Sequence, residues 1–98
     1  MSRIMVRYQV RPECAEENER LVREVFEELA VLRPDGFAYE SMVLSDGVTF
    51  VHVVDGDPSV LPTLAAFQRF SSTVGARCED PPRQTTVRVV GSFEGRAS

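Results

Sequence analysis

Residues 37–54, FAYESMVLSDGVTFVHVV, decide the fold of this chain. They contain two runs rich in β-branched and aromatic residues, 37–45 and 48–54, separated by the pair Asp46-Gly47. An Asp-Gly pair between such runs favours the type I′ turn of a two-residue hairpin, because both central residues of that turn need positive φ. We therefore predict an antiparallel hairpin in the middle of the chain.

The two-residue turn also sets which side chains of the hairpin lie opposite each other. It places Ser41 opposite His52 and Val43 opposite Phe50, and alternate residues of each strand then share a face. The first face carries aromatic and polar side chains: Tyr39, Ser41, Phe50 and His52. The second face is largely apolar and carries Glu40, Met42, Leu44, Thr49, Val51 and Val53.

The segments on either side of the hairpin each supply one strand and one helix. Residues 4–10 alternate with the period of two that a half-buried strand requires, and residues 14–32 place apolar side chains three and four positions apart, as in an amphipathic helix. Helical spacing returns from Leu64 and ends before Pro81, and residues 85–93 alternate again. The predicted order of elements is β-α-β-β-α-β.

This order predicts an α+β fold with the ferredoxin-like arrangement. Right-handed crossovers bring the four strands into one antiparallel sheet and place both helices on one face of it. The chain has 98 residues, which is the size of one domain, so we expect a single domain over residues 1–98.

The second face of the sheet has no helix to cover it in this arrangement. The first and last strands add Arg7, Gln9 and Arg88 to its apolar side chains. A large apolar patch with a few charged members usually marks an interface. We therefore expect a homodimer in which two sheets pack face to face, with Glu40 paired to Arg7 or Arg88.

Composition argues against several classes of function. The formal charge is −4 and all eleven basic residues are arginine, whereas binders of nucleic acid or anionic membranes need a basic excess. Two cysteines and one histidine cannot supply the four ligands of a structural zinc site. No apolar stretch approaches the length of a membrane span or of a signal-peptide core. We expect a cytoplasmic protein with no nucleic-acid, membrane or metal partner.

Four short segments carry a resemblance to a known group of proteins. They are residues 10–12 (VRP), 34–39 (PDGFAY), 50–53 (FVHV) and 67–70 (FQRF). With these segments the chain resembles the dimeric α+β barrel superfamily and, within it, the antibiotic-biosynthesis-monooxygenase-like proteins. The resemblance implies that two sheets close into a dimeric α/β barrel, and that a ligand lies between each sheet and its own helices.

The resemblance implies chemistry without a cofactor. The haem-degrading branch of the superfamily uses a histidine on the second helix, an asparagine on the first strand and a tryptophan. This chain has no tryptophan and no residue that matches the other two, so haem oxygenation is not implied. An acid-x-Trp step that follows the third strand in many relatives reads Val54-Asp55-Gly56 here.

His52 is the candidate catalytic residue. Its side chain is the only one in the chain with an ordinary pKa near neutrality, so it is the first candidate for a general base at pH 7. Tyr8, Tyr39 and Ser41 are candidates for orienting this base or binding a phenol-like substrate. The alternative is a structural histidine, exposed or hydrogen-bonded within the sheet.

Aromatic side chains are the candidates for an apolar pocket around His52. Phe50, Phe67 and Phe70, together with Tyr8 and Tyr39, could line a small-molecule site. The alternative is that they form the ordinary core of a two-layer domain. Asn18, the one asparagine of the chain, is expected to be a solvated residue of the first helix; the alternative is a role at the mouth of the pocket, since an amide can both donate and accept hydrogen bonds.

Two functions follow from these residues and from the resemblance. The first is a cofactor-independent monooxygenase or isomerase that acts on a small aromatic or polyketide-like substrate, with His52 as base. The second is a non-catalytic dimeric module of the same fold, which binds a small hydrophobic ligand or serves as a structural partner.

Overall fold

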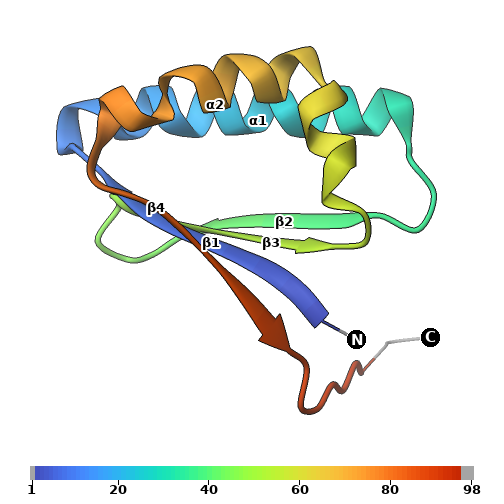
Figure 1. Cartoon of the computed structure of the whole chain (residues 1–98). Coiled ribbons are helices and arrows are strands. Elements are labelled where there is room, and N and C mark those ends of the chain that lie inside the picture. Colours follow the sequence, from blue (N-terminus) through green and yellow to red (C-terminus); the bar gives the residue numbers. More distant parts are fainter. Residues whose placement is uncertain (1, 96–98) are drawn as a thin grey trace.

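The computed structural model describes residues 2–95 and contains the predicted β-α-β-β-α-β order. Two short 3₁₀ helices, η1 and η2, precede the α-helices (Figure 1). In chain order the elements are β1 (Ser2–Val10), η1 (Pro12–Cys14), α1 (Ala15–Leu32), β2 (Ala38–Val43), β3 (Thr49–Asp55), η2 (Pro58–Thr63), α2 (Ala65–Arg77) and β4 (Cys78–Arg88).

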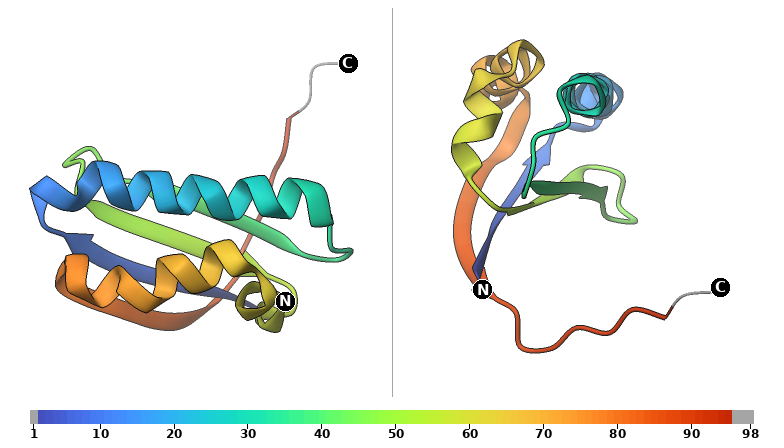
Figure 2. Two further views of the ribbon diagram at one scale, coloured as in Figure 1. Left: turned by 90° about the horizontal axis from the view of Figure 1, so that it is seen from above. Right: turned by 90° about the vertical axis from the view of Figure 1, so that its right-hand side faces the viewer.

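The four strands form one antiparallel sheet in the order β2-β3-β1-β4. Both α-helices lie over the same face of this sheet, and no helix of the described residues covers the other face (Figures 1 and 2). The ferredoxin-like α+β prediction is therefore confirmed. Within residues 2–95 no helix is both long enough and apolar enough to cross a membrane.

The predicted register of the hairpin is confirmed, but the predicted turn is wrong. Ser41 lies opposite His52, as expected. The loop spans residues 45–48, and Leu44 donates its N–H to the carbonyl of Thr49 at 2.8 Å. Loops of two and four residues with the same centre produce the same pairing of strand residues. The predicted register is therefore correct although the predicted turn type is not.

Asp46 explains why the turn differs from type I′. That turn would need positive φ at Asp46, but only Gly47, at φ 77°, adopts it within this loop. One carboxylate oxygen of Asp46 accepts hydrogen bonds from the backbone N–H groups of Val48 and Thr49, both at 2.9 Å. This local capping holds Asp46 in an ordinary conformation.

The start and end of β4 differ from the prediction. The strand begins at Cys78, directly after α2, and ends at Arg88, so Pro81 and Pro82 lie inside it. Proline is tolerated in a strand at the edge of a sheet, and here the register shifts between the pairs Arg7↔Arg83 and Gln9↔Asp80. The two prolines were interpreted as the end of the helical segment, and the last strand was therefore predicted to begin several residues after its actual start.

The shifted strand also changes which arginine joins the uncovered face. Arg88 alternates along β4 with Thr86 and Gln84, which lie opposite Ile4 and Val6. Ile4 and Val6 pack against the core on the helix side of the sheet, so the predicted place of Arg88 beside Arg7 is wrong. Arg83 lies opposite Arg7 instead. If Glu40 pairs with an arginine across a dimer, the candidates are now Arg7 and Arg83.

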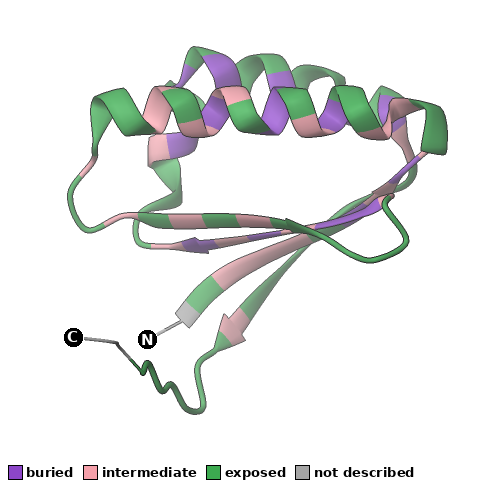
Figure 3. Ribbon diagram, turned by 180° about the vertical axis from the view of Figure 1, so that it is seen from behind, coloured by how far each residue is buried: buried purple, intermediate pink, exposed green. Residues whose placement is uncertain are grey.

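The core lies between the helices and the sheet. Figure 3 shows buried residues on the inner sides of α1 and α2 and along the part of the sheet that they cover, while β4 is mostly exposed. The buried apolar residues are Tyr8, Val10, Leu21, Val22, Val25, Phe50, Val54, Leu61, Leu64, Ala66, Phe70 and Val74.

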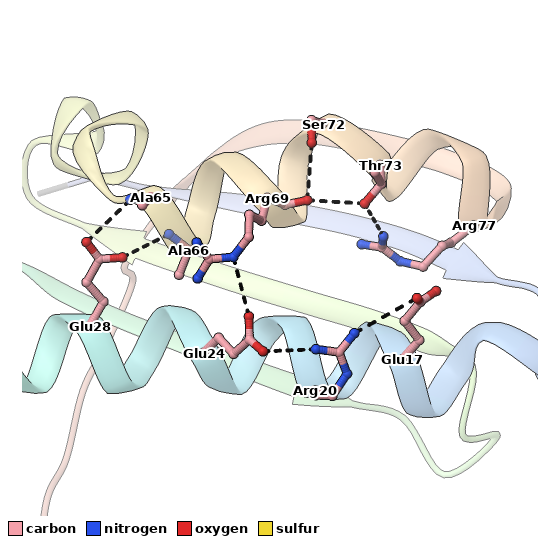
Figure 4. A network of polar contacts seen from close by, with 10 residues as sticks. All are labelled: Glu17, Arg20, Glu24, Glu28, Ala65, Ala66, Arg69, Ser72, Thr73 and Arg77. Carbon is pink, nitrogen blue, oxygen red and sulfur yellow. Dashed lines mark hydrogen bonds and ion pairs between the residues drawn. The ribbon is translucent and has the colours of Figure 1, made fainter.

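Carboxylates of α1 hold α2 in place over the sheet (Figure 4). Leu64, at the start of α2, has no side chain able to cap the helix. Glu28 of α1 supplies the cap, since its carboxylate accepts the backbone N–H groups of Ala65 at 3.3 Å and Ala66 at 2.9 Å. Glu24 adds an ion pair to Arg69 at 3.6 Å. These contacts fix the helix that roofs the candidate site.

Candidate functional site

His52 lies between two tyrosines on the buried face of the sheet. Its side chain is 4% exposed. Nε2 lies 2.8 Å from the hydroxyl of Tyr8, and Nδ1 lies 2.6 Å from the hydroxyl of Tyr39. Both ring nitrogens are therefore hydrogen-bonded to phenols.

The register of the sheet explains this arrangement. The residues directly opposite His52 are Val6 on β1 and Ser41 on β2. Tyr8 lies two positions after Val6, and Tyr39 lies two positions before Ser41. Both are on the same face as His52 and diagonal to it, within reach of long side chains. Their rings stack beside the imidazole with centroids 5.3 and 5.7 Å away.

Asn18 extends this network into α1. It is fully buried, so its predicted place on the solvated side of the helix is wrong. Its Nδ2 donates to the Tyr8 hydroxyl at 2.9 Å. The spacing Asn18, Leu21, Val22, Val25 puts it on the apolar face, and this periodicity was a signal available in the sequence.

Arg77, at the end of α2, completes the network and was missed in the sequence analysis. It is 4% exposed and donates from Nε to Oδ1 of Asn18 at 3.0 Å. Its Nη2 donates to the carbonyl of Phe70 at 3.3 Å, and the guanidinium lies 5.4 Å from the Phe70 ring centroid. The spacing Phe70, Val74, Arg77 places the arginine on the buried face of α2.

A cavity of about 550 Å³ opens beside His52. The sheet forms its floor, and η2 and α2 form its other walls. Five of the predicted site residues line this cavity: Tyr8, Tyr39, His52, Phe67 and Phe70. Most of the remaining lining residues are apolar, among them Ile4, Val6, Val54, Leu61 and Val74.

The other two predicted binding residues lie outside the cavity lining. Phe50 is buried beneath Tyr8, with its ring stacked at 5.6 Å from the Tyr8 ring. Ser41 is half-buried and lies opposite His52 on β2, but it does not line the cavity. Phe50 therefore supports the position of Tyr8. Ser41 is connected to the site only as the residue opposite His52 in the β2–β3 pairing.

Burial keeps the side chains of the network neutral. Desolvation lowers the pKa of His52 to about 4, so its imidazole carries no charge at pH 7. Desolvation also raises the pKa of Tyr8 and of Tyr39 far above the ordinary value, against a smaller lowering of the Tyr8 pKa by the Asn18 hydrogen bond. Arg77 is left as the charged member.

The described residues do not offer a metal site. Within residues 2–95 no three histidine, cysteine, aspartate or glutamate side chains gather so that they could hold a metal ion. The polar side chains that line the cavity are those of Tyr8, Tyr39, His52, Ser59, Ser71 and Gln84.

Fold and cavity together define the class: a small ferredoxin-like α+β domain that holds a cavity between its sheet and its second helix. Similar folds occur in solved structures. An antibiotic biosynthesis monooxygenase matches with a TM-score of 0.70 and 18% identity over 93% of this chain and all of that one. A candidate antibiotic biosynthesis monooxygenase from Nitrosomonas europaea matches with a TM-score of 0.76, 15% identity and the same coverage.

A third similar structure is SnoaB from Streptomyces nogalater, described as a cofactor-independent oxygenase. It matches with a TM-score of 0.67 and 14% identity over 96% of this chain and 97% of that one. No protein-family model and no curated protein matches the sequence. At these identities the likeness establishes the fold, so the chain has the fold of the antibiotic biosynthesis monooxygenases, as its resemblance predicted.

Proposed function

We propose that this protein is a cofactor-independent monooxygenase-like enzyme that acts on a small aromatic or polyketide-like substrate. The observation that carries the proposal is the Tyr8, His52, Tyr39 cluster in the wall of a largely apolar cavity. An apolar enclosure with a few placed polar groups is the usual form of a small-molecule site. The shared fold with a protein described as a cofactor-independent oxygenase supports the reaction class.

Oxygenation without a cofactor takes its electrons from the substrate. A ring CH₂ group becomes a carbonyl: R₂CH₂ + O₂ gives R₂C=O + H₂O, with one oxygen atom of O₂ in each product. The substrate reacts with O₂ far more readily as its enolate or phenolate, because the anion is the better electron donor. A protein of this kind therefore needs to bind a flat apolar molecule and stabilise a negative oxygen on it.

The cavity can meet both needs. Phe67, Phe70 and the aliphatic lining residues offer contact area for rings. A phenol at the wall can donate a hydrogen bond to an oxygen of the substrate. The general-base role of His52 stays a prediction: a pKa of about 4 leaves it free to accept a proton at pH 7 but gives little driving force for removing one from a phenol.

One observation favours the second candidate function, a non-catalytic ligand-binding module. Both nitrogens of His52 are already hydrogen-bonded to tyrosines of the same chain. A histidine that only supports the packing of the sheet would show the same contacts. Ligand binding without turnover would then be the whole function.

Ligand binding and oxygen consumption separate the two functions. Hydroxylated polycyclic aromatics are screened by thermal shift against the wild type, His52→Gln and Ser41→Ala, and each ligand that binds is followed in an oxygen electrode. We expect binding and oxygen uptake in the wild type, a loss of uptake in His52→Gln, and little change in Ser41→Ala, which lies outside the cavity lining. Binding with no oxygen uptake in the wild type would leave only the binding module.

A further inference from the structure

We infer that the hydrogen bonds of the network all run in one direction, with each group donating to the next: Arg77, Asn18, Tyr8, His52 and Tyr39. The Tyr39 hydroxyl can then donate a hydrogen bond to a ligand in the cavity. The ligand class that fits is a flat apolar molecule with an acceptor oxygen: a carbonyl, an enolate or a phenolate. This inference rests on the proposed function only in taking the cavity as the ligand site.

The direction starts at Arg77. A guanidinium only donates hydrogen bonds, so the atom of Asn18 that lies 3.0 Å from its Nε is the amide oxygen. The amide nitrogen of Asn18 then faces Tyr8, at 2.9 Å from the hydroxyl. Arg77 therefore determines the orientation of the Asn18 amide, which would otherwise have two choices.

The second step is at Tyr8. Its hydroxyl has one proton, and it accepts a hydrogen bond from Asn18. Among the described residues its other partner is Nε2 of His52, at 2.8 Å. The Tyr8 side chain is almost fully buried, where an unpaired hydroxyl proton would be costly. The proton is therefore donated to Nε2.

The third step is at His52. A neutral imidazole carries one proton, and with Nε2 as acceptor that proton is on Nδ1. Nδ1 donates to the Tyr39 hydroxyl at 2.6 Å. The proton of Tyr39 is not used by this network, and Tyr39 lines the cavity. A ligand in the cavity thus meets a donor.

The charge of the network favours an anionic ligand over a neutral one. The chain of hydrogen bonds has the buried cation Arg77 at one end and the cavity at the other. Bonds that point the same way polarise one another, so negative charge on an oxygen beside Tyr39 is stabilised. Asn18 and Arg77 act here as positioning residues, since they reach the ligand only through Tyr8 and His52.

Nuclear magnetic resonance of the imidazole tests the direction. His52 is the only histidine, so histidine-selective ¹⁵N labelling reports on a single ring. In the wild type we expect a protonated Nδ1 and an unprotonated Nε2 at pH 7. A protonated Nε2 would overturn the inference, and this measurement needs no variant.

Asn18→Asp should reverse the direction. A carboxylate cannot donate, so Tyr8 would donate to Asp, Nε2–H of His52 would donate to Tyr8, and the Tyr39 hydroxyl would donate to Nδ1. The side chain keeps its size and can still accept from Arg77. The expected result is transfer of the imidazole proton from Nδ1 to Nε2, and an unchanged tautomer would contradict the inference.

Three ligands of nearly the same shape test the ligand class. Fluorenone offers only an acceptor, carbazole only an N–H donor, and fluorene neither. We expect the wild type to bind fluorenone about threefold to tenfold more tightly than fluorene, and carbazole no better than fluorene. Asn18→Asp should favour carbazole, and Tyr39→Phe should abolish the preference for fluorenone.

The outcomes distinguish this inference from the proposed function. If fluorenone has no advantage in the wild type although all three ligands bind, the cavity binds ligands but the inferred donor is wrong. If none of the three binds, the cavity is not a ligand site, and the proposed function fails together with the ligand class. The imidazole spectrum still decides the direction of the network in that case.

Discussion

At the scale of single residues, the depressed pKa of His52 has a consequence for stability. The folded protein holds this imidazole with a pKa of about 4, while the unfolded chain has the ordinary value near 6.5. Between these values the unfolded state binds the proton more readily than the folded state does. The contribution of His52 to the free energy of unfolding is therefore present above about pH 6.5 and is lost as the pH falls toward 4.

We predict that the wild type loses about 2 kcal/mol of stability between pH 7 and pH 5 through His52 alone. The measurement is urea denaturation at both pH values, with His52→Gln as the control that removes this titration and keeps every carboxylate. The difference between the two proteins should shrink on acidification. Parallel losses in the two proteins would mean that the buried imidazole takes up its proton as easily as an exposed one.

Much of the residue-level site could be predicted from alternation and register. Once the hairpin pairing places Tyr39 and His52 on one face, their proximity follows from the geometry of any antiparallel sheet. Asn18 was interpreted from the sequence as exposed, and no prediction was made for Arg77. Asn18 and Arg77 also occupy apolar helix positions and are buried. Their burial depends on each other and on Tyr8, and such a network becomes visible only when the helices and the sheet meet.

At the scale of elements, α2 depends on a cap from a different helix. Glu28 accepts the backbone N–H groups of Ala65 and Ala66 (Figure 4). Loss of a capping acceptor typically costs about 1 kcal/mol. We predict that Glu28→Ala lowers the free energy of unfolding by about this amount, measured by urea denaturation at neutral pH.

The control for this prediction is Glu27→Ala. Glu27 is the neighbouring glutamate on α1 and is exposed, so its loss should change stability by less than about 0.5 kcal/mol. Because α2 roofs the cavity, Glu28→Ala should also weaken ligand binding. Equal effects of the two substitutions would show that the contact between Glu28 and the start of α2 contributes nothing.

The ends of elements were less predictable than their existence. Periodicity identifies a strand or a helix, but a proline pair is compatible with a helix end and with an edge strand alike. Which of the two applies to Pro81 and Pro82 depends on the strand order, which makes β4 an edge. The turn at Asp46 was mistaken for a similar reason, since its side chain offers a capping alternative to positive φ.

At the scale of the whole molecule, the helix-free face of the sheet is the candidate surface for assembly. Met42 is 42% exposed on this face, and Val51 and Val53 lie beside it, half-buried. We propose that two copies pack through these faces as a homodimer, because no helix or strand within residues 2–95 covers this face. The proposal is independent of what the cavity binds.

We predict that light scattering finds twice the chain mass of 11.0 kDa at micromolar concentration. Met42→Glu should shift the equilibrium toward a monomer by placing a charge in the apolar contact. Val31→Glu is the matched control, because Val31 is 85% exposed and belongs to α1, which lies over the opposite face of the sheet (Figure 1). A wild type that is monomeric throughout would refute the dimer.

The two prolines of β4 have one more consequence, for growth of the sheet. Proline has no backbone N–H, so Pro81 and Pro82 remove two hydrogen-bond donors from β4, which lies at an edge of the sheet. A foreign strand that approached this edge would find a gap in the ladder where it needs a partner. The sequence thus carries a built-in barrier to runaway strand addition, the route by which exposed sheet edges nucleate fibrils.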